Sequence, residues 1–179
     1  MRTGLRRRRR LRTRSRAKWG SRVTGTEQLR LQYRPERILV LFVGEAPPAS
    51  DSFFYRGNTG LTNYMRNALS GPKGDVEFLN WFKARGWYLD DLVTTPIEDL
   101  RDRRKKCREA RASLAARIAE YQPAAIVCLL KSISDDVEIA VSKANSRAPF
   151  YTVPFAGQGH QTKFNEQMRR ILPELPFAG

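Results

Sequence analysis

Short apolar runs recur along the chain, separated by longer stretches in which apolar and polar residues alternate with the period of a helix. Runs of this length are typical of strands that are covered on both faces of a parallel sheet. Their alternation with helical segments predicts an α/β fold with three layers, α/β/α, around a central four-stranded parallel sheet. The predicted strands cover residues 37–43, 87–94, 124–130 and 149–153.

Five helices are expected between and after these strands. The best defined is 101–121, in which Cys107, Leu114, Ile118 and Tyr121 recur near one face. Lysines and arginines crowd its first turns, and cations there oppose the helix macrodipole, so we expect this cluster to meet solvent or an anion. The predicted helices cover residues 59–70, 75–85, 101–121, 132–144 and 160–172.

The positive charge is concentrated at the N-terminus. The 179 residues include 33 Lys and Arg against 18 Asp and Glu, a net charge of +15, and eleven of the basic residues but no acid lie within 1–26. Such a run cannot bury apolar surface and repels itself, which predicts a disordered basic tail over 1–26 and one domain over 27–179. Three interpretations of the tail stay open: a nucleic-acid-binding arm, a transit-like or misassigned N-terminus, and a solvated extension.

Several classes of protein are excluded by composition. Cys107, Cys128 and His160 are the only cysteines and histidine, too few for a four-ligand zinc site, an iron–sulfur cluster or a disulfide framework. The longest apolar runs have six or seven residues, against the ~20 that a membrane-spanning helix needs. We therefore expect no metal centre and no membrane span.

The segment after strand 37–43 is the first candidate ligand-binding loop, because ligands of open α/β sheets bind beyond the carboxyl ends of the strands. Gly44 permits close approach of a ligand to the backbone. Pro47 and Pro48 stiffen the turn, so Glu45 projects a carboxylate from a fixed position at the edge of the sheet.

Three aromatic residues follow in this loop: Phe53, Phe54 and Tyr55. A ring among them could stack on a nucleobase, an interaction worth ~1–3 kcal/mol per base. The alternative is that these rings only fill the core.

The order of these segments resembles the uracil-DNA glycosylase superfamily, particularly branches whose first motif begins Gly-Glu-Ala-Pro. The residues that carry the resemblance are Gly44-Glu45-Ala46-Pro47, the aromatic trio, and the Gly-x-x-Gly-Leu segment that opens the next helix. Residues 87–96 and the long helix leading to 123–130 extend it to roughly 37–172. The cysteine ligands of the iron–sulfur branches are missing, and Cys107 and Cys128 are expected to be core thiols.

The resemblance implies hydrolysis of the N-glycosidic bond between deoxyribose and a flipped uracil or other deaminated base, without metal or cofactor. It implies that Glu45 positions or activates the attacking water. Gly44, Ala46 and Pro47 would line the substrate site beside it. Phe54 is the preferred stacking ring, with Phe53 and Tyr55 as rivals.

The second loop follows strand 87–94 and departs from the superfamily pattern. Many relatives read the base edge here with an asparagine, whereas this chain has Asp91 and, further on, Thr95. An ionised aspartate only accepts hydrogen bonds, so it would repel the carbonyl oxygens of uracil. Asp91 could instead recognise another lesion, be protonated by burial, or cap the connection.

The third loop follows strand 149–153. Where the superfamily carries a catalytic His-Pro pair, this chain has Val153 and Pro154, and His160 lies seven residues later at the start of the last helix. We expect His160 to meet a phosphate or the departing base, or to be a cap or surface residue. Residues of the same loop are expected to contact DNA: Gly157, Gln158, Gly159, Gln161 and Lys163.

The leading hypothesis is a monomeric, cofactor-free DNA-repair glycosylase that partners with DNA and not with a membrane, located in the cytoplasm or, in a prokaryote, at the nucleoid. A noncatalytic nucleic-acid-binding protein of the same fold is the alternative, favoured by the missing motif histidine and the net charge. A weaker third hypothesis is an enzyme acting on free nucleosides or nucleotides.

Overall fold

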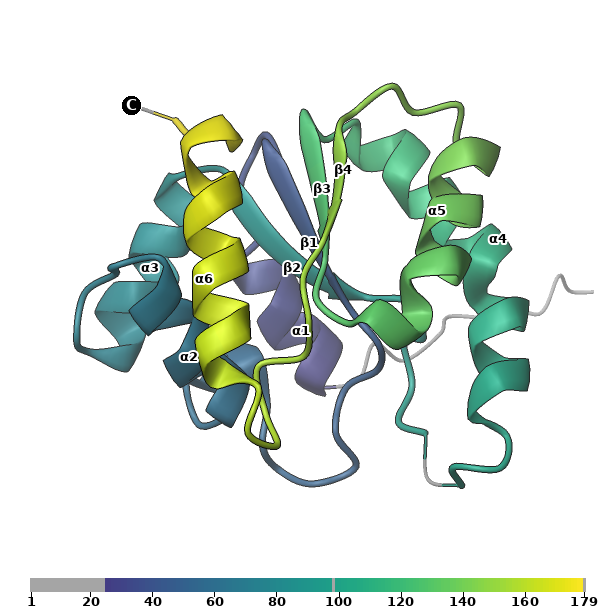
Figure 1. Ribbon diagram of the computed structural model, residues 1–179, viewed down its shortest axis with the longest axis horizontal. Coiled ribbons are helices and arrows are strands. Elements are labelled where there is room, and N and C mark those ends of the chain that lie inside the picture. The colour runs from purple at the N-terminus through teal and green to yellow at the C-terminus, as the bar shows by residue number, and fades with distance from the viewer. Residues whose placement is uncertain (1–24, 98, 179) are drawn as a thin grey trace, which may run out of the picture.

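The computed structural model describes residues 25–97 and 99–178 and confirms the predicted α/β architecture. Four strands form one sheet in the order β2-β1-β3-β4, and every neighbouring pair runs parallel (Figure 1). The strands are β1 (Val40–Gly44), β2 (Trp87–Asp91), β3 (Ala125–Cys128) and β4 (Phe150–Thr152). All residues of β1, β2 and β3 are buried, as expected for strands covered on both faces.

Helices cover both faces of the sheet and make it the middle of three layers. On one face lie α4 (Arg103–Tyr121) and α5 (Ser134–Lys143), and on the other lie α2 (Gly60–Ala68), α3 (Asp75–Ala84) and α6 (Gln161–Ile171) (Figure 1). Thr59 begins α2 as its N-cap, accepting a hydrogen bond from the Thr62 backbone N–H. The predicted apolar face of α4 is confirmed for Cys107, Leu114 and Ile118, which are all buried.

Strand β2 is shorter than the pattern predicts. Its apolar run continues through Leu92 and Val93, whose N–H groups donate to the backbone oxygens of Gly44 and Glu45 at 2.9 and 2.8 Å. These residues therefore follow the first loop beyond the end of the sheet. Backbone hydrogen bonds therefore hold the segments after β1 and β2 side by side.

The sequence pattern does not predict α1 (Gly25–Gln32), because Arg30 is the one residue that this helix buries. Gly25 and Thr26, assigned to the tail by composition, are its first residues, and residues 1–24 lie outside the described part of the chain. At its last residue, the backbone oxygen of Gln32 accepts from Lys83 of α3, and beyond its end Arg34 pairs with Glu120 of α4. The chain therefore passes the outer edge of β2, in contact with both helical layers.

An aromatic cluster fills the space between the sheet and α3. Phe42 of β1 contacts Phe82 and Trp87 with ring centroids 5.4 and 6.0 Å apart. Phe54, from the 3-10 turn η1 (Phe54–Arg56), joins through Phe82 at 5.5 Å and Phe78 at 6.3 Å. Part of the aromatic trio that the sequence offers to a ligand is thus committed to the core.

Two positions on α3 provide a matched test of this packing. Leu79 is 2% exposed and Val76 is 59% exposed. We expect Leu79→Ala to lower the free energy of unfolding by about 2–5 kcal/mol, because it leaves a cavity, and Val76→Ala to change it by less than about 0.5 kcal/mol. Urea denaturation followed by circular dichroism measures both, and equal effects would contradict the orientation of α3.

Candidate functional site

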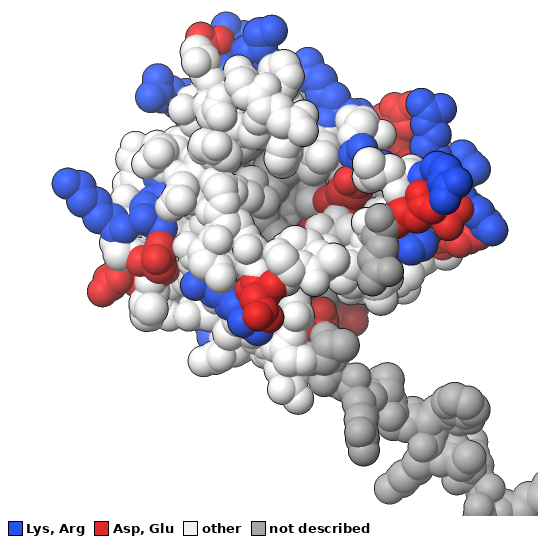
Figure 2. Space-filling model, turned by 90° about the horizontal axis from the view of Figure 1, so that it is seen from below, with Lys and Arg blue, Asp and Glu red and all other residues white. Residues whose placement is uncertain are grey.

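The loops at the carboxyl ends of the strands surround a cavity of about 630 Å³. Its wall comes from the segments after β1, β2, β3 and β4 and from the first residues of α4. Figure 2 looks onto this end of the molecule and shows a hollow with acidic atoms in its wall and basic side chains on its periphery. The lining residues are Gly44, Glu45, Ala46, Leu61, Asp91, Arg103, Leu130, Lys131, Ser132, Pro154, Phe155, Gln158, His160 and Lys163.

A second cavity of about 430 Å³ adjoins the first and is more aromatic. The two share four lining residues: Ala46, Leu61, Asp91 and Phe155. Pro47, Phe53, Phe54 and Tyr64 line only the second cavity. A charged compartment and an aromatic compartment therefore meet at the ends of β1 and β2.

Glu45 lies in the first cavity with its carboxylate already engaged. Its Oε1 accepts a charge-assisted hydrogen bond from Nε of Arg103, and Cys107 Sγ lies 3.8 Å from the same oxygen. Arg103 also donates to Ser132 Oγ at 3.2 Å, which fixes the guanidinium between two segments of the wall. Burial and the charge of Glu45 raise the pKa of the Cys107 thiol to about 11, so this sulfur is a neutral thiol at neutral pH.

Asp91 lies where the two cavities meet. Its carboxyl group is buried, and Gly44 on the neighbouring strand leaves room for it, because a Cβ at position 44 would lie 2.5 Å from Asp91 Oδ1. The first glycine of the sequence motif therefore has a packing role: it admits the carboxylate of β2 to the wall of the site.

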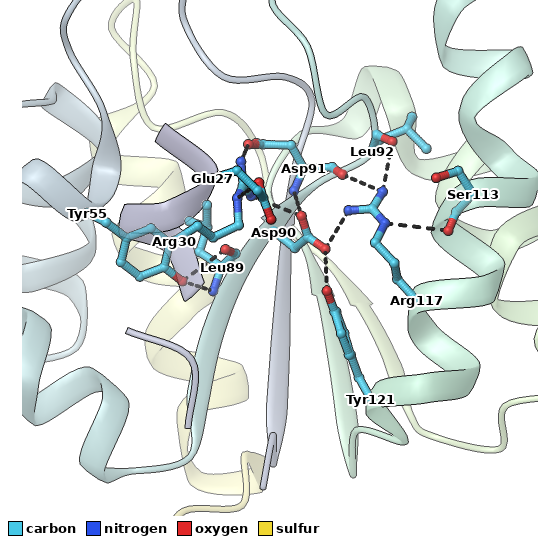
Figure 3. Close-up of polar contacts among 10 residues, drawn as sticks. All are labelled: Glu27, Arg30, Tyr55, Leu89, Asp90, Asp91, Leu92, Ser113, Arg117 and Tyr121. Atoms are coloured by element: carbon cyan, nitrogen blue, oxygen red, sulfur yellow. Dashed lines mark hydrogen bonds and ion pairs between the residues drawn. The ribbon is translucent and has the colours of Figure 1, made fainter. Parts of the chain in front are cut away.

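A buried guanidinium holds the two adjacent acids of β2 (Figure 3). Successive strand residues point to opposite faces, so Asp90 and Asp91 diverge, and Arg30 reaches both from the edge of the sheet. Its Nη1 donates to Asp90 Oδ1 at 2.9 Å and its Nη2 to Asp91 Oδ2 at 2.7 Å, with the Arg30 side chain 1% exposed. Glu27 pairs with Nε of the same guanidinium at 3.1 Å.

Helix α4 completes this network from the other face of the sheet. Arg117 donates to Asp90 Oδ2 and to the backbone oxygens of Asp91 and Leu92, the last two at 2.9 and 3.2 Å. Tyr121 lies 3.4 Å from the same oxygen of Asp90. Both carboxylates therefore have cationic partners, which is the condition for burying them without a large loss of stability.

The network shifts the pKa values of its members. Burial raises the pKa of the Asp91 carboxyl, and the charge and hydrogen bond of Arg30 oppose that shift. Burial alone would lower the pKa of Arg30, but the charges of Asp91 and Asp90 together raise it above its usual range. Arg30 is therefore a permanent cation beside the site.

The aromatic trio separates into two roles. Tyr55 is fully buried and lines neither cavity; its hydroxyl donates to the Leu89 backbone oxygen at 2.9 Å and accepts from the Leu89 N–H at 2.7 Å. The Tyr55 hydroxyl thereby pairs with backbone N–H and C=O groups at the outer edge of β2. Because the ring is buried, it cannot offer a face to a ligand. Phe53 and Phe54 border the second cavity but are only 3% exposed. Among the aromatic rings that line the cavities, the most exposed is Phe155, which is 41% exposed and borders both.

The third loop places some of its predicted DNA-contacting and catalytic residues at the first cavity. Gln158, His160 and Lys163 line the first cavity. Gly157 packs against the Phe155 ring, where a Cβ would overlap it, and Gly159 has a φ of +82° in the turn before α6. These two glycines shape the loop, but neither lines a cavity.

Two further predicted contacts lie away from the first cavity. Gln161 donates to the Tyr64 hydroxyl at 3.2 Å, tying α6 to α2. Thr95 is exposed and borders neither cavity. Val153, at the position of the motif histidine, is buried and donates its N–H to the Cys128 backbone oxygen.

Sequence analysis missed Arg30, the Arg103–Glu45 pair and Phe155. Two neighbouring acids in an otherwise apolar strand signal a buried cation, but nothing in the pattern says which arginine supplies it. For the basic start of α4 the pattern predicts contact with solvent or an anion, and Arg103 contacts an anion within the protein, the carboxylate of Glu45. Phe155 carried no signal beyond its place in a glycine-containing loop.

No protein-family model matches the sequence, and no curated protein matches it either. Within residues 25–97 and 99–178, no group of three or more histidine, cysteine or acidic side chains could hold a metal ion. The same residues contain no helix long and apolar enough to cross a membrane.

The buried network gives a stability prediction. We expect Arg30→Met to lower the free energy of unfolding by about 3–5 kcal/mol, because it leaves two buried carboxylates short of a cation. The control is Arg34→Met, which breaks a more exposed pair with Glu120 and is expected to lower it by less than about 1 kcal/mol. Chemical denaturation of both variants compares them, and similar losses would contradict the central role of Arg30.

Gly44 gives a second prediction. Gly44→Ala is expected to lower the free energy of unfolding by about 1–3 kcal/mol, because the new Cβ overlaps Asp91 Oδ1 and forces that carboxylate to move. Gly25→Ala is the control, since a Cβ there meets no atom within 4 Å and alanine favours helix. Thermal unfolding measures both, and a neutral Gly44→Ala variant would show that the wall of the site is free to relax.

Proposed function

We propose that this protein is a DNA glycosylase, which hydrolyses the N-glycosidic bond of a base flipped into the paired cavities. The observation that carries the proposal is the convergence of Glu45, His160 and basic side chains on one cavity that opens into an aromatic one. The motif resemblance to uracil-DNA glycosylases supports the same reaction and puts uracil and other deaminated bases first among the substrates to test.

The two compartments suit the two parts of a nucleotide. The aromatic cavity, bordered by Phe53, Phe54 and Phe155, offers apolar walls and the exposed ring of Phe155 to a planar base. The first cavity, bordered by Lys131 and Lys163, offers ammonium groups to phosphates. A base in the aromatic cavity would place its sugar near the shared wall.

In this arrangement Glu45 positions and activates the attacking water, and His160 stabilises the leaving base. The Arg103 contact orients the carboxylate and leaves Glu45 Oε2 for a water molecule beside the sugar. The N-glycosidic bond breaks with its electron pair going to the base, where a donor from His160 would stabilise the charge; the water oxygen bonds to the sugar carbon and its proton passes to Glu45. General acid–base groups of this kind typically contribute 10²–10⁴-fold each.

A noncatalytic nucleic-acid-binding protein is the second candidate. It is favoured by two observations: Glu45 is already paired with Arg103, and the motif histidine is replaced by the buried Val153. This candidate predicts binding of DNA or RNA with a steep dependence on salt concentration and no release of base.

Direct assay separates the two candidates. Purified protein is incubated with oligonucleotides that each carry one uracil, hypoxanthine, xanthine or alkylated base, and abasic sites are then cleaved with alkali. Strand scission at one of these bases supports the glycosylase. Tight, salt-sensitive binding without scission at any base would replace the proposal with the second candidate.

The role of Glu45 has its own test. Glu45→Gln keeps the shape of the side chain but removes its charge, so we expect single-turnover release of the best substrate base to fall about 100-fold to 10,000-fold. The control is Glu120→Gln, because Glu120 is an exposed residue of α4 that pairs with Arg34, and this variant is expected to retain full activity. Full activity of Glu45→Gln would remove this carboxylate from the mechanism.

A further inference from the structure

The carboxylate of Asp91 has two oxygens in different surroundings. Arg30 holds Oδ2 at 2.7 Å, and the side chain as a whole is 7% exposed. Oδ1 lies over Gly44, itself part of the cavity wall, and no hydrogen bond to it is formed within residues 25–97 and 99–178. An acceptor that no described residue engages, on a side chain that lines both cavities, is a position at which a ligand donor would bind.

Arg30 decides what this acceptor can recognise. A guanidinium cannot accept a hydrogen bond and remains charged, so its contact with Oδ2 favours the ionised carboxylate. An ionised carboxylate is an acceptor only. While Asp91 is ionised, the oxygen on the cavity side attracts N–H groups and repels carbonyl oxygens.

From this geometry we infer that the site selects a base that keeps an exocyclic amino group, with Asp91 Oδ1 accepting from that amine. The inference rests on the proposed function and narrows its substrate class. It also departs from the motif resemblance, which points to deaminated bases. The substrates would be damaged bases of the cytosine, adenine or guanine type that retain their amine.

The chemistry of base pairs explains the selectivity. Uracil differs from cytosine, and hypoxanthine from adenine, by an oxo group in place of the amine and by a proton on the adjacent ring nitrogen. An oxo group opposite Asp91 Oδ1 would bring two acceptors together, whereas an amine completes a charge-assisted hydrogen bond. A ligand that covers this acceptor without donating to it leaves the acceptor unpaired, which is a strong basis for rejection.

Asp90 is an internal control for the inference. It is the other acid of the network, held by Arg30 and Arg117, but it points to the α4 face and lines neither cavity. Replacing either acid with its amide removes one charge from the same buried cluster. Only replacement of Asp91 changes the groups that a ligand meets.

The experiment measures binding without catalysis. The probes are four single-stranded oligonucleotides, each with one base flanked by abasic spacers: cytosine, uracil, adenine or hypoxanthine on a 2′-fluoroarabino sugar that resists hydrolysis. We expect the wild-type protein to bind cytosine over uracil and adenine over hypoxanthine by at least about tenfold. Asp91→Asn offers a donor as well as an acceptor, so both ratios should fall toward one or reverse, while Asp90→Asn should keep them.

The wild-type ratios test the inference even if a variant fails to fold. Equal binding of the paired bases, preference for uracil or hypoxanthine, or binding no tighter than an all-spacer strand would overturn it. An unchanged preference in a folded Asp91→Asn variant would overturn the role of Asp91. Selective binding of amino-bearing probes, without base release in the lesion assay, would support the inference and overturn the hydrolase proposal. Release of uracil in preference to amino-bearing bases would support the hydrolase proposal and overturn the inference.

Discussion

The structure depends on one buried interaction, the contact of the Arg30 guanidinium with the carboxylates of Asp90 and Asp91. The acids end the edge strand β2 and point to opposite faces of the sheet, and Arg30 is the cation that reaches both, while Arg117 pairs with Asp90 from the α4 face. Arg30 does so from α1, which packs beside the outer edge of β2. Helix α1 is thereby an integral part of the domain although it follows directly on the basic N-terminal run.

The same interaction connects the fold to the candidate site. Asp91 is at once a member of the buried network and part of the wall shared by the two cavities. Its position depends on Gly44, which leaves space for the carboxylate, and its charge state depends on Arg30. The structural role of Asp91 and the recognition role proposed for it therefore involve one side chain, and a change in Gly44 or Arg30 would alter both.

The acids of the site differ in how they are held. Glu45 is partly exposed and paired with Arg103 at the cavity wall, where a ligand phosphate would compete for the guanidinium. Asp91 is buried and paired with an arginine that no ligand can reach. Under the proposed function the first carboxylate would be able to change partners, while the second would present a fixed acceptor. This contrast suits a division between chemistry and recognition.

The sequence by itself determined the α/β class, the parallel sheet and the position of candidate site residues after the strands. These features follow from hydrophobic periodicity and from the order of strands and helices, which are local properties of the chain. It also brought Glu45, Asp91 and His160 to one end of the sheet. Only the tertiary structure decided which aromatic ring is accessible: Tyr55 completes the hydrogen bonds of an edge strand, Phe53 and Phe54 pack inward, and Phe155 remains open. The pairings of Arg30 and Arg103 were equally hidden, since they join residues about 60 positions apart, and long-range contacts of that kind depend on how the layers pack, which no local pattern records.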